Sequence, residues 1–313
     1  MPKWPINMAQ GEFHDLAELQ LNINPATQTI VSSWGNLGYW PDTGGAQLAE
    51  VSTGYSQACE QLAREVAFMG DINSTHKLLD TGFGCGDQLL LWIQEFNLQT
   101  LYGLNLSHSQ TQFAKNKIAN TTFNENVICE INVADCCQEE SWQTLDNDFQ
   151  RIIALDCIYH FSHKAQYFSL CEQHLVDEGV LVVSDLLLIK EHLPVWQKLL
   201  LKSICGLSHI PYGNFKTFDQ YQQQLADSGL TITRHKDISK QVLLPFGSWL
   251  KTYIPSVKDS PHLPKNSSWL KYKGVAKFLA WGYKKNIFSY CILRIEKKRI
   301  KNRIKADIYS EHK

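Results

Sequence analysis

Lys77-Leu78-Leu79-Asp80-Thr81-Gly82-Phe83-Gly84-Cys85-Gly86-Asp87 is the stretch that decides the fold. It predicts a short buried strand over 77–80, a glycine-rich turn and an amphipathic helix over 88–96. Gly82, Gly84 and Gly86 let the backbone turn sharply and leave space for a ligand against it. Their G-x-G-x-G spacing differs from the G-x-G-x-x-G of a dinucleotide site and from the G-x-x-x-x-G-K-S/T of a phosphate loop. We therefore expect a ligand other than NAD or ATP, and Asp80 suits one that carries an ammonium group. A chance glycine-rich turn is the alternative.

Apolar runs alternate with helical patterns from residue 77 to residue 185, which is typical of a parallel α/β sheet. The strands are nearly continuously apolar, so helices are expected on both faces of the sheet. Counting the strand over 77–80, the pattern predicts seven strands, and the other six are expected at 100–104, 126–133, 149–155, 179–184, 230–238 and 286–295. Helices are expected at 108–119 and 163–175.

Three additions surround this core, which we assign to residues 77–295. Residues 1–76 form an N-terminal extension with aromatic and helical patterns, and residues 186–229 form an insertion between the fifth and sixth strands. Prolines 245, 255, 261 and 264 predict an irregular segment over 239–285. The tail 296–313 holds seven Lys or Arg against three Asp or Glu. Such a tail is usually a solvated helix end, and binding to anionic lipid or nucleic acid is the alternative.

The composition excludes several classes of protein. The formal net charge of −1 gives no overall field that favours nucleic acid, so no nucleic-acid partner is expected. The nine cysteines form no C-x-x-C pair, so no metal site is expected. Their odd number and scattered positions indicate a reducing, cytoplasmic location. Residues 1–10 lack the apolar core of a signal peptide, and no run approaches the roughly 20 apolar residues of a membrane-spanning helix.

Polar side chains follow several of the predicted strands. In open α/β sheets ligands bind outside the carboxyl ends of the strands, so these residues are the candidates for a binding site. Asp80 ends the first strand. The later candidates are Asn105, Leu106 and Gln110 after the second, Asp135 and Cys136 after the third, and Asp156, Tyr159 and His160 after the fourth.

The glycine turn resembles the first motif, D/E-x-G-x-G-x-G, of the class I S-adenosylmethionine-dependent methyltransferases. Residues 103–110 are similar to the G-x-x-I/L/V-S-x-x-Q stretch of cyclopropane-fatty-acid synthases and of sterol and tocopherol methyltransferases. The resemblance covers residues 34–240. It implies a Rossmann-like methyltransferase sheet and S-adenosyl-L-methionine as the cofactor.

The resemblance also implies roles at the cofactor. Asp80 and the three glycines would meet the methionine part. Asn105 stands where these enzymes usually have an acidic residue that accepts hydrogen bonds from the ribose hydroxyls. Its amide oxygen can still accept a hydrogen bond, but a weaker one, because it carries no negative charge. Gln110 would lie near the adenosine, or else be a solvated helix residue. Asp135 would accept from the adenine amino group, or else be a surface residue at a strand end. Leu106, Cys136 and Asp156 belong to the same expected site.

The segment Ser33-Trp34-Gly35-Asn36-Leu37-Gly38-Tyr39-Trp40 resembles the H-x-G-Y-W/Y stretch that precedes the core in tocopherol and sterol methyltransferases, without its histidine. By that resemblance it is a lid, and Tyr39 touches the cofactor's carboxylate. An aromatic cluster that pins the extension to the core is the other reading. His160 is the candidate acid-base group, since an imidazole titrates near neutral pH, or else it only packs at the strand end. Tyr159 orients a substrate or fills the wall.

Residues 193–210 predict an amphipathic helix and a turn. Its Leu199, Leu200, Leu201 and Ile204 are too apolar for a free surface, which favours a helical cap over the substrate. A face that skims a membrane is the alternative.

The sequence thus predicts methyl transfer from S-adenosylmethionine to a small hydrophobic or aromatic acceptor, at O, N or C, as in secondary metabolism. The rivals are a cyclopropane-synthase-like enzyme that alkylates a lipid alkene, a protein that binds S-adenosylmethionine without catalysis, and an NAD oxidoreductase. A homodimer is compatible with the sequence.

Overall fold

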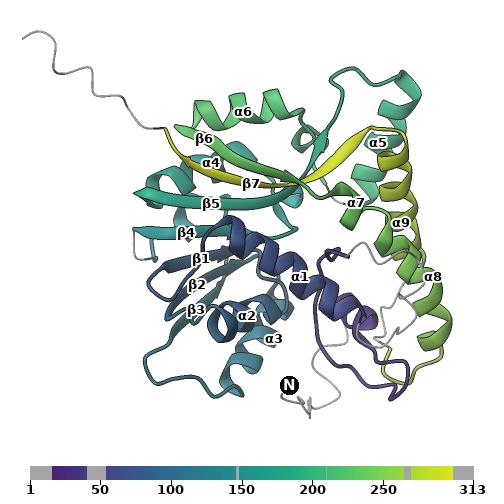
Figure 1. Cartoon of the computed structure of the whole chain (residues 1–313), viewed down its shortest axis with the longest axis horizontal. Helices are drawn as coiled ribbons and strands as arrows, with labels where there is room; N and C mark the ends of the chain where they lie inside the picture. Colours follow the sequence, from purple (N-terminus) through teal and green to yellow (C-terminus); the bar gives the residue numbers. More distant parts are fainter. Residues whose placement is uncertain (1–15, 41–53, 146–147, 209, 264–268, 299–313) are drawn as a thin grey trace, which may run out of the picture.

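The computed structural model describes residues 16–40, 54–145, 148–208, 210–263 and 269–298. Seven strands form one sheet in the order β3-β2-β1-β4-β5-β7-β6 (Figure 1). Strands β1 to β5 run parallel, and β7 is antiparallel to both of its neighbours. The predicted seven-stranded, mostly parallel sheet is therefore confirmed. The strands are β1 Lys77–Thr81, β2 Thr100–Asn105, β3 Ile128–Val133, β4 Phe149–Ala154, β5 Leu175–Leu188, β6 Leu230–Asp237 and β7 Phe288–Lys297.

Helices cover both faces of the sheet. Helices α1 (Gly54–Met69), α2 (Asp87–Glu95) and α3 (His108–Ala119) bury residues such as Leu62 and Trp92 in one core. Helices α4 (Lys164–His174) and α6 (Phe218–Asp227) bury Tyr167 and Tyr221 in the core of the other face. A sheet covered in this way leaves its strand ends as the place where polar groups can gather.

Local signals fix where the helices begin. The Ser107 hydroxyl accepts a hydrogen bond from the backbone N–H of Gln110 at 3.3 Å, which caps α3 directly after β2. Thr217 and Gln220 form a reciprocal capping box at the start of α6. Because the β2–α3 connection is so short, Asn105 and Gln110 stay at the edge of the sheet.

Two predictions need correction. Strand β5 extends well beyond the predicted 179–184, because its residues pair with β7 as far as Leu188 opposite Phe288. Most of the described residues between 239 and 285 are helical, in α7 (Ser239–Val242), α8 (Pro245–Val257) and α9 (Trp269–Lys284), and 264–268 lie outside the described residues. A proline in the first turn costs a helix nothing, and Pro255 lies near the end of α8. Burial of an apolar face outweighs the proline there.

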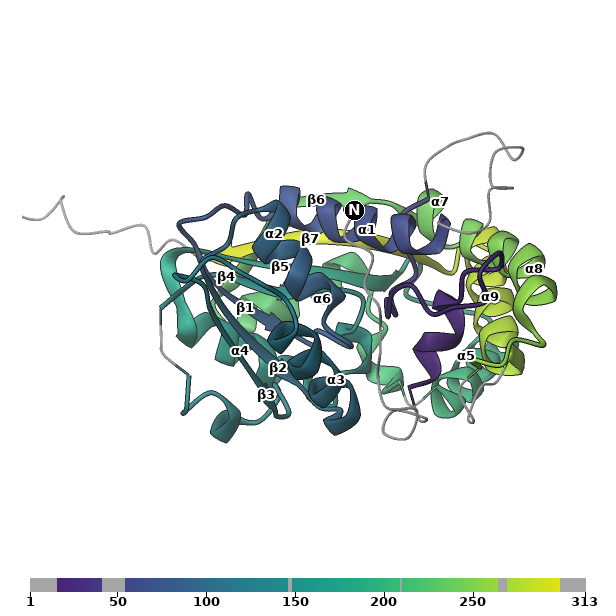
Figure 2. The same cartoon turned by 90° about the horizontal axis from the view of Figure 1, so that it is seen from below.

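A third group of helices stands beyond one end of the sheet, formed by α5 (Val195–Leu207), α8 and α9 (Figure 1). Figure 2 shows the N-terminal segment, with the short helix η1 (Ala17–Asn22), between this group and the sheet. Three more short helices complete the described elements, η2 Glu139–Ser141, η3 Ile158–His160 and η4 Tyr212–Asn214. Among the described residues, none of the helices has the length and apolar character needed to cross a membrane.

The basic tail lies mostly outside the described residues. Its first residues, Glu296 and Lys297, end strand β7 instead of forming a helix, and 299–313 are not described.

Candidate active site

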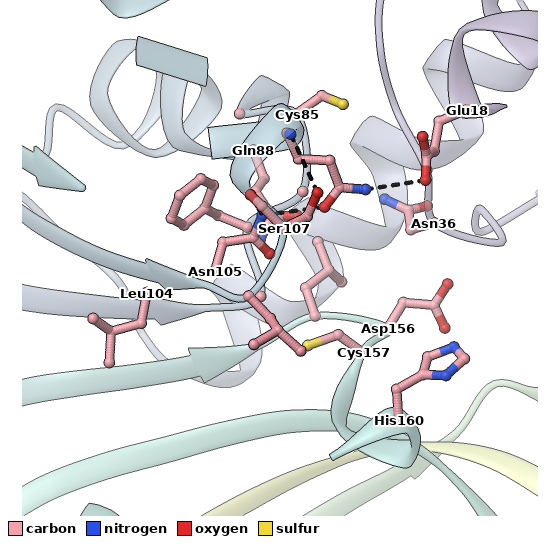
Figure 3. A pocket seen from close by; sticks show the side chains of 18 of the residues that line it. Glu18, Asn36, Cys85, Gln88, Leu104, Asn105, Ser107, Asp156, Cys157 and His160 are labelled. Carbon is pink, nitrogen blue, oxygen red and sulfur yellow. Dashed lines mark hydrogen bonds between the residues drawn. The ribbon is translucent and has the colours of Figure 1, made fainter. Parts of the chain in front are cut away.

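A cavity of about 560 Å³ opens at the carboxyl ends of β1, β2, β3 and β4. It is lined by the glycine turn, by the strand ends that the sequence singled out, and by residues 33–36 of the N-terminal segment (Figure 3). The volume suits a small organic ligand or cofactor.

The three glycines of the turn have different roles. All have positive φ angles, of 82° at Gly82, 56° at Gly84 and 87° at Gly86. A Cβ at Gly82 would lie 2.6 Å from the Cys157 sulfur, and one at Gly86 would lie 2.7 Å from the Ala114 Cβ. A Cβ at Gly84 would meet nothing within 4 Å. Gly82 and Gly86 therefore let the turn pack on the protein, whereas Gly84 keeps open the space a ligand would use.

Asp80 does not lie where the sequence placed it. Its side chain is fully buried and is not part of the cavity wall. Its oxygens accept hydrogen bonds from Gln88 Nε2 at 2.8 and 2.9 Å and from Trp92 Nε1 at 2.7 Å. Desolvation by burial raises the pKa of Asp80 to about 6, against the effect of these donors. The carboxylate therefore ties the turn to α2 and does not face a ligand's ammonium group.

A chain of polar groups runs from β2 to the N-terminal segment. Asn105 Nδ2 donates to Gln110 Oε1 at 3.1 Å, and Gln110 Nε2 donates to Glu18 Oε1 at 3.0 Å. All three residues line the cavity, and Figure 3 shows Glu18 and Asn105 on it. Leu106 lines it too and is largely exposed. Glu18 therefore adds a carboxylate to the chain of polar groups that begins at the Asn105 amide.

The end of β3 contributes Asp135 and Cys136 to the cavity wall. Asp135 Oδ1 accepts from the backbone N–H of Cys137 at 2.9 Å, which fixes the carboxylate after the strand. Asp135, Cys136 and Cys137 also place three potential metal-binding atoms within 4.8 Å of one another. Burial raises the pKa of the Cys136 thiol, whereas the hydrogen bond with Cys136 lowers the pKa of Cys137, so the two neighbouring thiols differ in how readily they ionise.

Asp156 joins three separate parts of the molecule. Its Oδ2 accepts from the backbone N–H of Leu37 at 2.7 Å, and its Oδ1 accepts from the hydroxyls of Tyr159 at 3.0 Å and Tyr290 at 2.5 Å. Desolvation raises the pKa of Asp156 to about 6, while these hydrogen bonds act in the opposite direction. The carboxylate lies on the cavity wall and holds the N-terminal segment against β4 and β7.

His160 and Tyr159 differ in their access to the cavity. His160 is exposed and lines it, on the same side as Asp156 (Figure 3). Tyr159 is half-buried outside the wall, its ring 4.7 Å from that of His160. Its hydroxyl is committed to Asp156, and burial raises its pKa well above the ordinary value.

The N-terminal segment covers the cavity, but not through Tyr39. That residue lies outside the wall, with its backbone bonded to Ala58 and Lys236 over its ring. Its expected position at the ligand is therefore corrected: the aromatic ring pins the segment to the core. The Ser33 hydroxyl also fastens the segment, because it donates to Asp87 Oδ2. Lys117 Nζ donates to the same oxygen at 2.7 Å.

Two polar residues that the sequence analysis missed are Glu18, which lines the cavity, and Lys117, which lies outside its wall and donates to Ser33 and Asp87. Glu18 lies far from the core in sequence, in a stretch without a motif, so no pattern signals it. Lys117 is one of several lysines in the chain, and only its position on α3 facing Asp87 distinguishes it.

Comparison with known proteins gives consistent results. The profile of the family "Mycolic acid cyclopropane synthetase" matches residues 51–272. Erythromycin 3''-O-methyltransferase of Saccharopolyspora erythraea is 24% identical over 260 residues, covering 80% of this chain and 78% of that protein. Methyltransferase GfsG of Streptomyces halstedii is 23% identical over 232 residues, covering 74% and 76%. The solved structure of the cyclopropane synthase MmaA2 from Mycobacterium tuberculosis has a TM-score of 0.67 at 15% identity, covering 94% and 100%.

The cavity also fits the cofactor of this class. Gly84 leaves the cradle open, acceptors for hydroxyl and amino groups lie along the wall, and the volume is adequate. The family match spans more than half of the chain and includes the glycine turn and all the candidate strand ends. The chain therefore belongs to the mycolic acid cyclopropane synthetase family and is a class I S-adenosylmethionine-dependent methyltransferase.

Proposed function

We propose that this enzyme methylates O, N or C of a small hydrophobic or aromatic acceptor. The observation that carries the proposal is the position of His160. Its imidazole lines the cofactor cavity beside Asp156, and the ring of Tyr159, which lies outside the cavity wall, is 4.7 Å away. A nucleophile with a proton to lose needs such a group within reach.

Bound S-adenosylmethionine supplies an activated methyl group on its sulfonium, so the protein mainly has to position the two reactants. We assign the Gly82–Gly86 turn to the methionine part. Glu18, Asn105 and Gln110 would hydrogen-bond the ribose hydroxyls of the bound cofactor, and Asp135 would accept from its adenine amino group. Leu106 and Cys136 would pack on the adenine. Residues 33–36 exclude water over the cavity.

His160 accepts the acceptor's proton at an imidazole nitrogen as the new bond forms. Asp156 keeps the N-terminal segment closed beside it through the Leu37 N–H. We infer that Tyr159 acts as a support for Asp156, since its hydroxyl is already engaged.

Cyclopropanation of a lipid alkene is the second candidate, favoured by the family match and by the likeness to MmaA2. The two reactions share the cofactor and differ in the acceptor. The two methyltransferase relatives, of which one is an O-methyltransferase of erythromycin, favour the first.

Turnover of S-adenosylmethionine with a labelled methyl group, against hydroxylated aromatic and macrolide-type acceptors and unsaturated acyl lipids, tests this proposal. Both reactions add one CH₂ unit, so mass alone cannot separate them. Proton NMR does, because cyclopropanation removes the alkene signals and methylation leaves them. His160→Asn should lower kcat on an O–H acceptor while leaving S-adenosylhomocysteine affinity unchanged. Turnover with no panel member, or products formed equally well by His160→Asn, would contradict the proposal.

We also propose a cytoplasmic location, supported by nine cysteines that are all free. A homodimer stays a prediction, which sedimentation of the purified protein tests.

A further inference from the structure

The helices α5, α8 and α9 carry a one-sided charge. They contain seven lysines and no Asp or Glu, whereas the whole chain has 30 Lys and Arg against 31 Asp and Glu. All seven lysines are exposed, and among the described residues none of them forms an ion pair. The rest of the chain holds 23 Lys and Arg against the same 31 Asp and Glu, so these helices are a positively charged group on a chain that is otherwise acidic on balance.

Large apolar side chains are exposed on the same helices. On α5, Val195 is 75% exposed, Trp196 56% and Leu199 60%, and on α9 Leu270 is 82% exposed. The three α5 residues lie on one side of the helix because Val195 and Trp196 precede Leu199 by four and three positions. Exposed apolar side chains are ordinary when scattered singly, but a group of them indicates a binding surface.

The two sets of side chains form one continuous face. The rings of Trp196 on α5 and Trp281 on α9 are 6.2 Å apart, which joins the two helices. Leu270, Lys273, Lys277 and Trp281 follow one another along a single side of α9, at intervals of three or four residues. We call the surface formed by Val195, Trp196 and Leu199 of α5 and Leu270, Lys273 and Lys277 of α9 the α5/α9 face.

We propose that the α5/α9 face docks on an anionic lipid surface. Lysines attract the negative headgroups, and their methylene stems extend along apolar surface while the ammonium groups stay at the interface. Tryptophan prefers the same interfacial depth, and leucine and valine enter the acyl boundary. The lysines of the α5/α9 face therefore match the anionic headgroups of a bilayer, and its apolar side chains match the acyl boundary directly beneath them. The proposal is independent of which acceptor is methylated.

The charge also argues against a second copy of this chain as the occupant. A symmetric dimer through this face would bring Lys273 and Lys277 near their own counterparts, and like charges repel. An acidic protein would pair with the lysines, but its negative charge does not account for the exposure of Trp196 and Leu199 beside them. It is therefore an alternative outcome of the test and not the proposal.

Co-sedimentation with vesicles tests the proposal, using phosphatidylcholine alone and phosphatidylcholine with about one third phosphatidylglycerol. We expect the full-length protein to bind the anionic vesicles and not the neutral ones, with binding that weakens as salt rises. Lys273→Glu with Lys277→Glu should lower the partition coefficient by about tenfold or more. Trp196→Ala with Leu199→Ser should lower it as well, because both kinds of side chain are needed.

The matched control is Lys115→Glu with Arg234→Glu, which makes the same change in net charge on α3 and β6. Both positions are exposed and lie outside the three helices. It should bind anionic vesicles much as the wild type does. S-adenosylhomocysteine affinity should be unchanged in every variant, which separates a lost docking surface from a lost fold or a wrong cofactor. Equal binding to neutral vesicles, no binding to either, or an equal loss in the control pair would overturn the proposal. Capture of an acidic protein without vesicle binding would do so too.

Discussion

Gly84 differs from its two neighbours in the turn in what an added side chain would meet. A methyl group there projects into the open cavity and is also strained by a φ of 56°, at about 1–2 kcal/mol. Gly84→Ala should therefore weaken S-adenosylhomocysteine binding about tenfold or more, as calorimetry measures. Gly86→Ala is the control: its Cβ meets Ala114, so its main effect should be a lower melting temperature. A folded Gly84→Ala variant with unchanged affinity would remove the turn from the cofactor site.

We expect Glu18 and Asn105 to compensate for each other, because both bond Gln110 on the cavity wall and Glu18 supplies a carboxylate to that chain of polar groups. Glu18→Gln should weaken S-adenosylhomocysteine binding by about 1.5–3 kcal/mol, the range for hydrogen bonds to charged groups. For an analogue without the ribose hydroxyls the loss should vanish.

Asn105→Asp should restore affinity in the Glu18→Gln background and not in the wild type, where two carboxylates would repel each other. Glu125→Gln, at an exposed position, is the control. Equal losses for both ligands would mean that Glu18 only holds Gln110 in place.

Asp156 predicts a pH dependence of stability. Its pKa is about 6 in the folded chain and near 3.8 when unfolded, so the folded state holds a proton between these values. Unfolding releases that proton, and stability falls as the pH rises through the window. Relative to Asp156→Asn, the wild type should lose about 2–3 kcal/mol of unfolding free energy between about pH 4 and about pH 7. Urea unfolding at each pH measures this difference. Exposed Asp177→Asn should show none, and a flat difference for Asp156→Asn would contradict the assignment.

For individual residues, the sequence predicts which side chains reach the cavity better than it predicts which partners they contact. Asn105, Gln110, Asp135 and His160 all line one cavity, because parallel strands bring their carboxyl ends to the same edge. Asp80 was misplaced because its strand-end position does not reveal that Trp92, twelve residues on, turns its indole toward it. Glu18 depends on long-range packing that no local pattern encodes.

Helix α8 positions the N-terminal segment through one hydroxyl. The backbone N–H of Ile23 donates to Tyr253 Oη at 2.8 Å, and this hydroxyl donates to the Gln20 carbonyl at 2.8 Å. Tyr253→Phe leaves buried polar groups unpaired, which should cost about 1–3 kcal/mol of unfolding free energy. S-adenosylhomocysteine affinity should fall as well, because Glu18 lies in the same short helix, η1. Tyr283→Phe on α9 is the control. Unchanged affinity in Tyr253→Phe would show that α8 does not position Glu18.

Elements built on periodic apolar residues were predictable, and those governed by tertiary packing were not. Helix α3 has its predicted bounds because Ser107 caps it locally. Helix α8 was missed because proline content suggests irregular chain, yet Phe246, Trp249, Leu250 and Tyr253 recur at helical spacing and are buried.

Helix α5 was predicted, but its orientation only in part. Leu201 is fully buried, whereas Leu199 and Leu200 are exposed. Apolar residues on three consecutive positions cannot all face one side of a helix. A role of α5 as a cap over the acceptor stays a prediction, carried by Leu201 and not by Leu200.

For the molecule as a whole, cofactor binding should appear as added stability. A ligand that binds only the folded chain at about 100 times its dissociation constant contributes about 2.7 kcal/mol. For a chain of this size the melting temperature should rise by about 5 °C with S-adenosylhomocysteine. NADH at the same concentration should give no rise. A rise in melting temperature with NADH and not with S-adenosylhomocysteine would instead support the NAD oxidoreductase hypothesis.

The hydrogen bonds from Leu37 to Asp156 and from Ser33 to Asp87 have a kinetic consequence. They fasten the segment whose residues 33–36 form one wall of the cavity. We expect these hydrogen bonds to open before S-adenosylhomocysteine dissociates, which makes product release, and not methyl transfer, the step that limits turnover.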